Sequence, residues 1–161
     1  MKKKIFSFAI AGLVCLGLHS KVSAQRGASY QNAIGLFIDA GNGGTLVGPH
    51  FKHFFNSRDA GQIMVLFGNN WTRIGAEYSY NAPISGANGL KWNIGVGPQV
   101  GFYSNQGYSQ TDFFIRPMVG LEYKVPQVPI AFGFDWRPDW ALTHGSNFEA
   151  GRFGIAFKYA F

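Results

Sequence analysis

Three side chains near the C-terminus carry the chemical groups of a nucleophilic hydrolase. His144, Ser146 and Glu149 supply an imidazole, a hydroxyl and a carboxylate, which act as base, nucleophile and orienting group in acyl hydrolases. The stretch between Trp140 and Ala150 is too short, however, to place His144 and Ser146 on a defined strand face. We therefore expect a polar loop with no catalytic residue here. A hydrolase built on these three residues is the alternative.

Two other motifs that resemble ligand sites are better explained as structure. His50 and His53 are three residues apart, so in a strand their side chains point to opposite faces and would not share a metal ion. The glycine-rich stretch 41–44 is expected to be a turn, because no helix follows it as a phosphate loop requires. We expect no metal site and no cofactor.

Trp136 and Trp140 enclose a short proline-containing segment. Tryptophan is enriched where a protein meets the membrane–water interface, so we expect both side chains to anchor the chain there. Contact with a sugar or with lipopolysaccharide is the alternative role for the same pair.

A larger group of charged residues stands at alternate positions in otherwise apolar segments. It consists of Asp39, Arg73, Glu77, Arg116, Glu122, Lys124, Asp135, Arg137, Arg152 and Lys158. In a sheet that closes into a barrel these side chains would point into the lumen. We expect Glu77, Glu122, Lys124 and Lys158 in the inner half of the lumen, towards the periplasm, and the other six in the outer half, towards the outside of the cell. Unpaired charges in such an interior cost several kcal/mol each. We therefore expect pairs, Arg116 with Asp135 and Arg152 with Asp39, and a surplus of arginine in the outer half that could hold an anion.

These positions require strands, because side chains alternate between two faces in an extended chain. Eight segments show this period: 31–39, 45–55, 61–69, 71–81, 90–103, 112–124, 128–138 and 150–161. A soluble β-sandwich would bury their aromatic-rich faces and expose the charged ones, so we disfavour it. Glycine and other small residues at many inner positions suit a narrow barrel.

The fold is predicted from the lack of a segment that could cross a membrane as a helix. After Ala24 no apolar run approaches the length of a spanning helix, so a membrane-spanning structure must be a closed barrel. We predict an all-β chain that forms an eight-stranded antiparallel up-and-down transmembrane β-barrel. Pro49, Pro98 and Pro117 each remove a ladder hydrogen bond, and we expect β-bulges at these residues.

An even-stranded bacterial barrel keeps both termini in the periplasm, which fixes the side of every connection. We expect 40–44, 69–70, 104–111 and 139–149 outside the cell, and 56–60, 82–89 and 125–127 in the periplasm. Two aromatic girdles are expected near the rims: Trp71, Phe102, Trp136 and Trp140 on the outer side, and Tyr80, Trp92, Tyr123 and Tyr159 on the inner side.

The first residues have the features of a secretory signal peptide. Three lysines precede an uncharged stretch at 5–18, which is too short to span a bilayer. Small residues up to Ala24 predict cleavage after it, so we expect a signal peptide at 1–24 and one barrel domain at 25–161. Cleavage removes four of the 14 Lys and Arg residues, which leaves 10 against 8 acidic residues. This near balance argues against a nucleic-acid partner.

The last segment resembles the C-terminal signal that the barrel assembly machinery reads in outer-membrane proteins. Arg152, Gly154, Phe157 and Tyr159 fill its polar, glycine and two hydrophobic places, before the terminal aromatic Phe161. With the signal peptide and the strand pattern, the chain resembles the small OmpA/OmpX-like, porin-like outer-membrane β-barrel proteins. This resemblance implies a location and a fold, not one activity.

The stretch 144–147 also resembles the His-x-Ser-Asn motif of lipid A 3-O-deacylases, which are eight-stranded barrels as well. In that family the carboxylate lies about one hairpin step further on, in the last strand. Here Glu149 follows Ser146 by only three residues, so this sequence departs from the pattern of that family.

We therefore expect a small outer-membrane barrel with a plugged lumen and a structural, adhesive or accessory role. A lipid A-modifying acyl hydrolase and a small solute pore are the alternatives. The expected partners are outer-membrane lipids, lipopolysaccharide and, during biogenesis, the barrel assembly machinery. We expect the protein to be a monomer.

Overall fold

The computed structural model describes residues 30–161 of the chain. The expected signal peptide at 1–24 lies outside the described residues. The described part contains ten strands: β1 (Asn32–Gly41), β2 (Leu46–Phe54), β3 (Asp59–Phe67), β4 (Trp71–Pro83), β5 (Leu90–Asn105), β6 (Tyr108–Lys124), β7 (Ile130–Trp136), β8 (Asp139–Ala141), β9 (Asn147–Glu149) and β10 (Arg152–Ala160). It includes no helix that is long and apolar enough to cross a bilayer.

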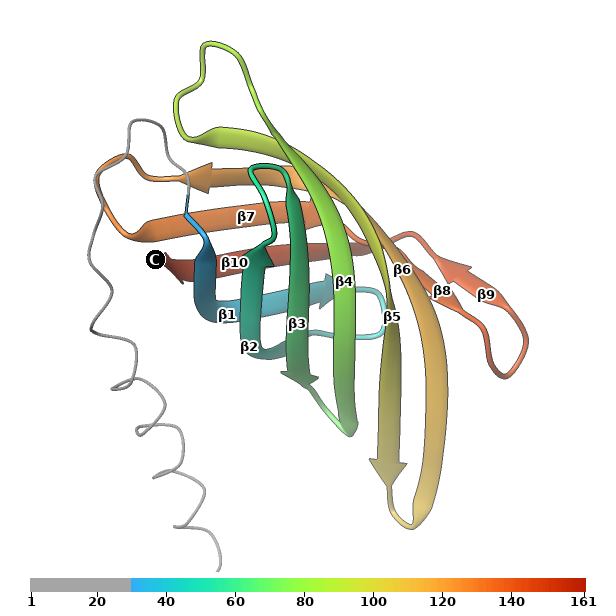
Figure 1. The fold of residues 1–161 in the computed structure, drawn as a ribbon. Helices are drawn as coiled ribbons and strands as arrows, with labels where there is room; N and C mark the ends of the chain where they lie inside the picture. The colour runs from blue at the N-terminus through green and yellow to red at the C-terminus, as the bar shows by residue number, and fades with distance from the viewer. Residues whose placement is uncertain (1–29) are drawn as a thin grey trace, which may run out of the picture.

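Eight of these strands close into an antiparallel barrel, as the sequence predicted. β1 to β6 pair with their neighbours in chain order, β7 pairs with β6 and β10, and β10 closes the ring against β1. The ends are joined by hydrogen bonds in both directions between Asn32 and Phe161, at 2.7 and 2.8 Å. The start of β1 and the C-terminus therefore lie at one end of the barrel (Figure 1). We refer to the other end as the distal end.

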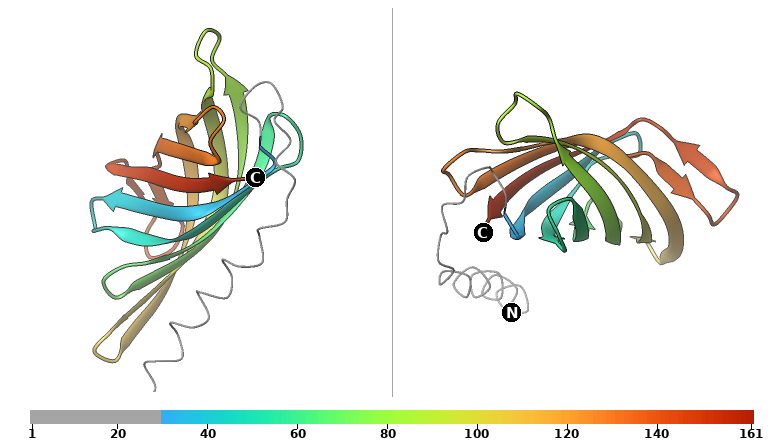
Figure 2. Two further views of the ribbon diagram at one scale, coloured as in Figure 1. Left: turned by 90° about the vertical axis from the view of Figure 1, so that its left-hand side faces the viewer. Right: turned by 45° about the horizontal axis from the view of Figure 1, so that its top comes forward.

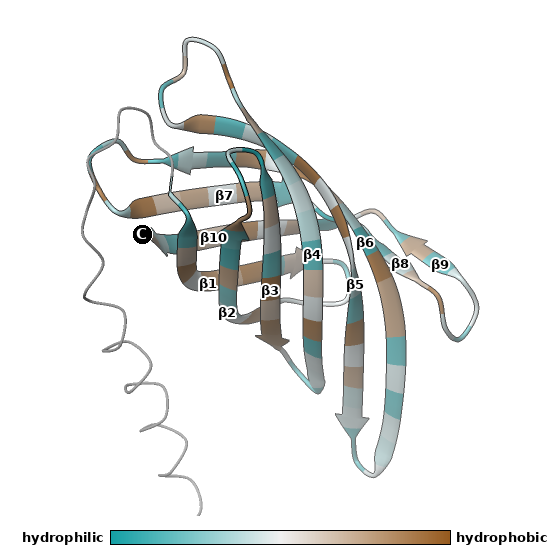
Figure 3. Ribbon diagram, in the orientation of Figure 1, coloured by the Kyte–Doolittle hydropathy of each residue, from teal (hydrophilic) through white to brown (hydrophobic). Residues whose placement is uncertain are grey.

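The two faces of each strand differ in polarity. In β10, Phe153, Phe157 and Tyr159 are 43%, 46% and 45% exposed, whereas Arg152 and Lys158 are 3% and 5% exposed. Figure 3 shows the resulting bands of apolar and polar residues along the strands. Soluble monomers rarely expose an apolar surface of this extent, so the outer face suits hydrocarbon and the inner face a polar lumen.

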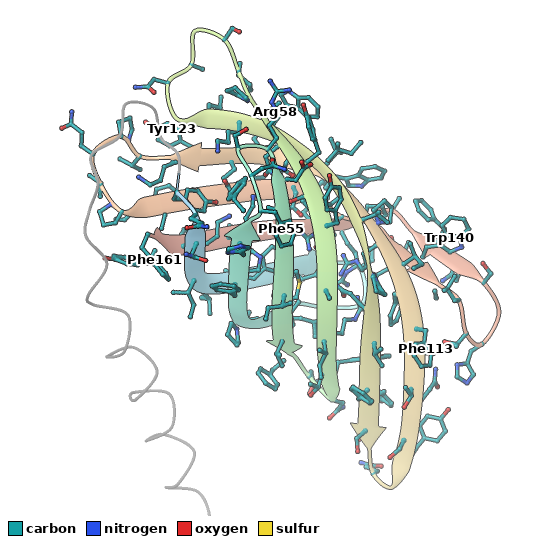
Figure 4. The ribbon with its side chains drawn as sticks, in the orientation of Figure 1. Phe55, Arg58, Phe113, Tyr123, Trp140 and Phe161 are labelled. Carbon is teal, nitrogen blue, oxygen red and sulfur yellow. The ribbon has the colours of Figure 1, made fainter. Side chains whose placement is uncertain are left out.

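Aromatic side chains mark both rims of the outer face. Tyr123 and Phe161 point outward at the end with the C-terminus, and Phe113 and Trp140 point outward at the distal end (Figure 4). Of the residues predicted for the girdles, Phe102, Trp136, Trp140, Trp92, Tyr123 and Tyr159 are exposed. Trp71 is not part of the outer girdle, because it lies on the lumen side and packs against a buried apolar cluster.

The strand prolines leave gaps in the ladders, so the prediction of bulges is wrong. β2–β3 and β4–β5 each lack two successive pairs beside Pro49 and Pro98, and the register is the same on both sides of each gap. Pro117 lies opposite Pro138, between the β6–β7 and β6–β8 ladders, which share one register. A missing N–H therefore removes hydrogen bonds here without an inserted residue. β7 and β8 are in effect one strand that is interrupted at Pro138.

Two distal connections are more ordered than the sequence predicted. β5 and β6 pair as far as Asn105 and Tyr108, so the loop expected at 104–111 is a two-residue turn. Its residues Gln106 and Gly107 have positive φ values of 46° and 88°, as such hairpin turns require. The segment 139–149 contains the β8–β9 hairpin, which leans away from the barrel (Figure 2).

Candidate functional site

Arg116 lies at the centre of an ion-pair network in the distal half of the lumen. Its side chain is fully buried and pairs with Asp39 at 2.5 Å and with Asp139 at 2.6 Å. Asp39 also pairs with Arg152 at 2.9 Å, as expected between the neighbouring strands β1 and β10. Two arginines therefore share one buried carboxylate.

Arg137, and not Arg116 as the sequence predicted, pairs with the carboxylate of Asp135. Its Nε lies 2.7 Å from Asp135, and its Nη1 lies 2.5 Å from Glu77 across the lumen. The predicted Arg116–Asp135 pair is therefore wrong. Arg137 follows Asp135 by two residues and faces the same side of the chain, so it reaches this carboxylate locally.

Asp139 belongs to the network although the sequence placed it in a loop. It lies in β8 and pairs with Arg73 at 2.7 Å as well as with Arg116. The alternation of Asp135, Arg137 and Asp139 is the signal for this position, but the intervening proline predicts the end of a strand.

With Asp139 and Glu77 included, the network has no surplus charge. Four arginines face four carboxylates: Arg73, Arg116, Arg137 and Arg152 against Asp39, Glu77, Asp135 and Asp139. The excess positive charge that was expected in the outer half is therefore balanced within the described residues.

A second buried cluster surrounds Glu122 in the half of the lumen near the termini. Its carboxylate accepts bonds from Lys158, from Lys52 at 2.9 Å and from the Tyr30 hydroxyl at 2.6 Å. Lys52 also donates to Asn81 at 2.7 Å. The sequence missed Lys52, because the neighbouring histidines hide the alternation of β2.

Lys124 does not join this cluster, contrary to expectation. Its Nζ donates to the backbone carbonyls of Val125 and Val128, at 3.1 and 2.7 Å. The residue ends β6, so its side chain reaches the turn more easily than the lumen. It stabilises the connection to β7 instead.

His144, Ser146 and Glu149 each have other partners. The Nδ1 of His144 lies 2.8 Å from Asp112, and the Ser146 hydroxyl accepts a bond of 3.1 Å from the indole of Trp140. Among the described residues no hydrogen bond joins the three to one another. The geometry of a base that activates a nucleophile, which the hydrolase hypothesis requires, is therefore not formed by this set.

Glu149 fastens the β8–β9 hairpin to the turn after β1. One carboxylate oxygen, Oε1, accepts bonds from the Gly151 backbone N–H at 2.8 Å and from the Asn42 amide at 2.9 Å. These two donors favour the charged form and hold the pKa of Glu149 below its usual value. The carboxylate stays ionised at neutral pH.

A cavity of about 230 Å³ opens at the distal end of the lumen, above the ion-pair network. We call it the mouth cavity. Its polar walls come from the turn after β1, from β4, from the β8–β9 hairpin and from the start of β10: Asn42, Arg73, Asp139, Asn147, Glu149 and Arg152. Trp71 and Phe114 supply apolar surface, and the guanidinium of Arg73 lies 4.3 Å from the ring centre of Phe114. The sequence did not predict this cavity, because it brings together residues from segments that are far apart in the chain.

The residues of the expected assembly signal lie on both faces of β10. Arg152 and Gly154 point inward, whereas Phe157, Tyr159 and Phe161 are 46%, 45% and 37% exposed on the outside. The aromatics are therefore accessible at the strand that closes the barrel. Their reading by an assembly machinery stays a prediction.

Comparison with solved structures identifies the architecture. The N-terminal β-barrel domain of Pseudomonas aeruginosa OprF superimposes with a TM-score of 0.64 at 14% sequence identity, over 81% of this chain and 100% of that domain. This chain has the fold of a small outer-membrane β-barrel. Neisserial surface protein A also matches, with a TM-score of 0.45 and 14% identity over 80% of this chain and 91% of that protein. No protein-family model and no curated protein sequence matches this chain.

Proposed function

We propose that the chain is an exported protein of the bacterial outer membrane, with a lumen closed to ion flow and a structural, adhesive or accessory role. The apolar outer face and the likeness of fold to an outer-membrane barrel domain support this location. With an even number of strands both ends of the barrel chain lie in the periplasm, so the distal end faces the outside of the cell.

The observation that carries the closed lumen is the size of the side chains that are buried in it. Arg116, Arg137 and Lys52 are among the largest fully buried side chains, and each is held by carboxylates from other strands. An eight-stranded barrel encloses little more than its own side chains. The paired arginines and lysines therefore occupy the space that a continuous water column would need.

Planar-bilayer recording of the refolded barrel, residues 25–161, tests this proposal. We expect no stable conductance steps from the native sequence, and none from Asp135→Asn, because Arg137 retains its pair with Glu77. Reproducible unit steps from the native barrel would overturn the closed lumen and favour the small solute pore.

The structure gives the hydrolase alternative no support, because its three residues bind other groups. Mass spectrometry of lipid A from deletion and overexpressing strains decides this point independently. We expect the same acyl pattern in both strains. The loss of one acyl chain on overexpression, abolished by Ser146→Ala, would establish the hydrolase.

A further inference from the structure

The mouth cavity has the size and the access of a binding site for one small ligand. At about 230 Å³ this cavity is smaller than the sites for drug-sized molecules, which occupy roughly 300–1,000 Å³, so it suits a ligand of one ring. Its lining comes from the β1–β2 turn and the start of β2, from β4 and β6, from the β8–β9 hairpin and from the start of β10. The inference rests on the proposed function only in placing this end outside the cell.

The charges around the cavity favour a neutral ligand. Arg73 and Arg152 supply two positive groups, and Asp139 and Glu149 supply two negative ones. Three of the four already pair with one another, Arg73 with Asp139 at 2.7 Å and Arg152 with Asp139 at 3.5 Å. An anion such as phosphate would meet carboxylates as well as guanidinium groups, so its binding gains little from the arginines.

The cavity retains hydrogen-bonding capacity of both kinds. The exposed side chain of Asn147 lines the cavity, and an amide both donates and accepts hydrogen bonds. Both bonds to Glu149 are made at Oε1, so its other oxygen remains an acceptor. A ligand with hydroxyl groups, which both donate and accept, matches this combination.

Apolar surface lies beside these polar groups. Trp71, Phe114 and Leu46 line the same cavity, and Trp71 is held in place by Tyr103, with 5.2 Å between the ring centres. A pyranose ring presents hydroxyl groups at its edge and C–H groups on its faces, so one ring can satisfy both parts of this wall. A fully polar ion cannot.

We propose that the mouth cavity binds one neutral sugar ring, such as a terminal residue of a glycan chain outside the cell. Trp71 contacts the C–H face, and Asn147, Glu149 and the guanidinium of Arg73, which covers the Phe114 ring, bind hydroxyl groups at the ring edge. The protein thereby has a carbohydrate-binding site at its distal end, within an adhesive role.

Fluorine NMR of the barrel labelled with fluorotryptophan tests the site directly. The protein has four tryptophans, and Trp71 lines the cavity whereas Trp92, Trp136 and Trp140 are 40%, 39% and 49% exposed on the outer face. Trp71→Phe identifies its resonance. We expect glucose, galactose or N-acetylglucosamine, each added to about 10 mM, to shift the Trp71 signal saturably and leave the other three unchanged.

Variants separate binding from folding. Arg73→Gln and Asn147→Ala should each raise the sugar concentration that gives half of the maximal Trp71 shift, by at least about fivefold. Ser109→Ala, on the neighbouring β5–β6 hairpin, should leave this concentration unchanged. Asn147 is exposed, so its variant keeps the barrel intact even if Arg73→Gln does not fold. The absence of a Trp71 shift with all three sugars, or a stronger shift with phosphate or glycine, would overturn the proposal. Sugar binding and ion conductance are measured independently, so the failure of one proposal does not imply the failure of the other.

Discussion

The buried ion-pair network depends more on the side chain of Arg116 than on any other. Arg116→Met leaves Asp39 with Arg152, and removes the closest partner of Asp139. Removing one partner of a buried ion pair typically costs about 3–5 kcal/mol. We therefore expect the free energy of unfolding, measured by urea titration in lipid vesicles, to fall by about this amount.

The matched control for this substitution is Arg58→Met. Arg58 is exposed, and its guanidinium donates to the Tyr80 hydroxyl at 2.8 Å. Exposed substitutions usually change stability by about 0.5 kcal/mol or less. Equal losses from the two variants would show that the Arg116 network does not stabilise the barrel.

At the scale of single residues, the sequence predicted which side chains enter the lumen better than it predicted their partners. Alternation placed Asp39 and Arg152 inside, and their strands are neighbours, so the pair could be foreseen. Arg116 crosses the lumen to Asp39, which lies on a strand that is not its neighbour. A strand pattern carries no information on which opposite wall a long side chain reaches.

The contact between β1 and β10 closes the barrel and leaves no room for a side chain at Gly35. A Cβ added there would lie 1.9 Å from the Phe157 carbonyl oxygen, so Gly35→Ala must displace one of the two strands. Overpacking typically costs about 1–3 kcal/mol, and we expect at least the upper value. Urea midpoints and the heat-modifiable mobility of the folded barrel on gels measure the effect.

Gly133→Ala is the comparison, since its added Cβ would meet the Ala156 methyl at 3.3 Å. A small shift of the neighbouring strand accommodates this contact, so we expect a much milder loss. If Gly35→Ala folds as well as Gly133→Ala, the β1–β10 contact is not the constraint that the geometry implies.

The C-terminal strand should contribute more to assembly than the apolar surface that it adds to the barrel. We expect the double substitution Tyr159→Ser and Phe161→Ser to lower the amount of heat-modifiable barrel in cells without lowering synthesis. The matched control is Phe132→Ser with Phe134→Ser on β7, which removes two outward aromatics of similar exposure. Equal losses in both variants would mean that only apolar area matters, and that the C-terminus is not read as a signal.

At the scale of strands, the sequence predicted the eight barrel strands because alternation is clear in most of them, although the histidines hide it in β2. It failed at the prolines, where the sequence predicted β-bulges. Pro117 and Pro138 face each other, so a single gap accommodates both missing donors and the register continues. The β8–β9 hairpin was missed because strands of three residues are too short to show a period.

The whole protein should be exported and processed. We expect membrane-extracted protein to begin at Gln25, since small residues precede this position, and to fractionate with outer membranes. Intact-mass spectrometry measures the first point. A mass that includes residues 1–24 would refute the cleaved signal peptide.

At the scale of the molecule, the closed barrel could be predicted because only one architecture combines apolar and charged faces of this period in a membrane. The mouth cavity could not be predicted. It depends on how the turn after β1 and the β8–β9 hairpin meet above β4, through contacts such as the one between Asn42 and Glu149. Loops of this kind are positioned by side-chain contacts, which leave no periodic trace in a sequence.

The β5–β6 hairpin offers a place to carry foreign peptides on a cell surface. Its ladder continues without a gap to Asn105 and Tyr108, and a Cβ added at Gly107 would have no atom within 4 Å. An epitope inserted between Gln106 and Gly107 should therefore leave the paired strands below it intact. Antibody staining of unbroken cells would then report both display and the direction in which the barrel is inserted.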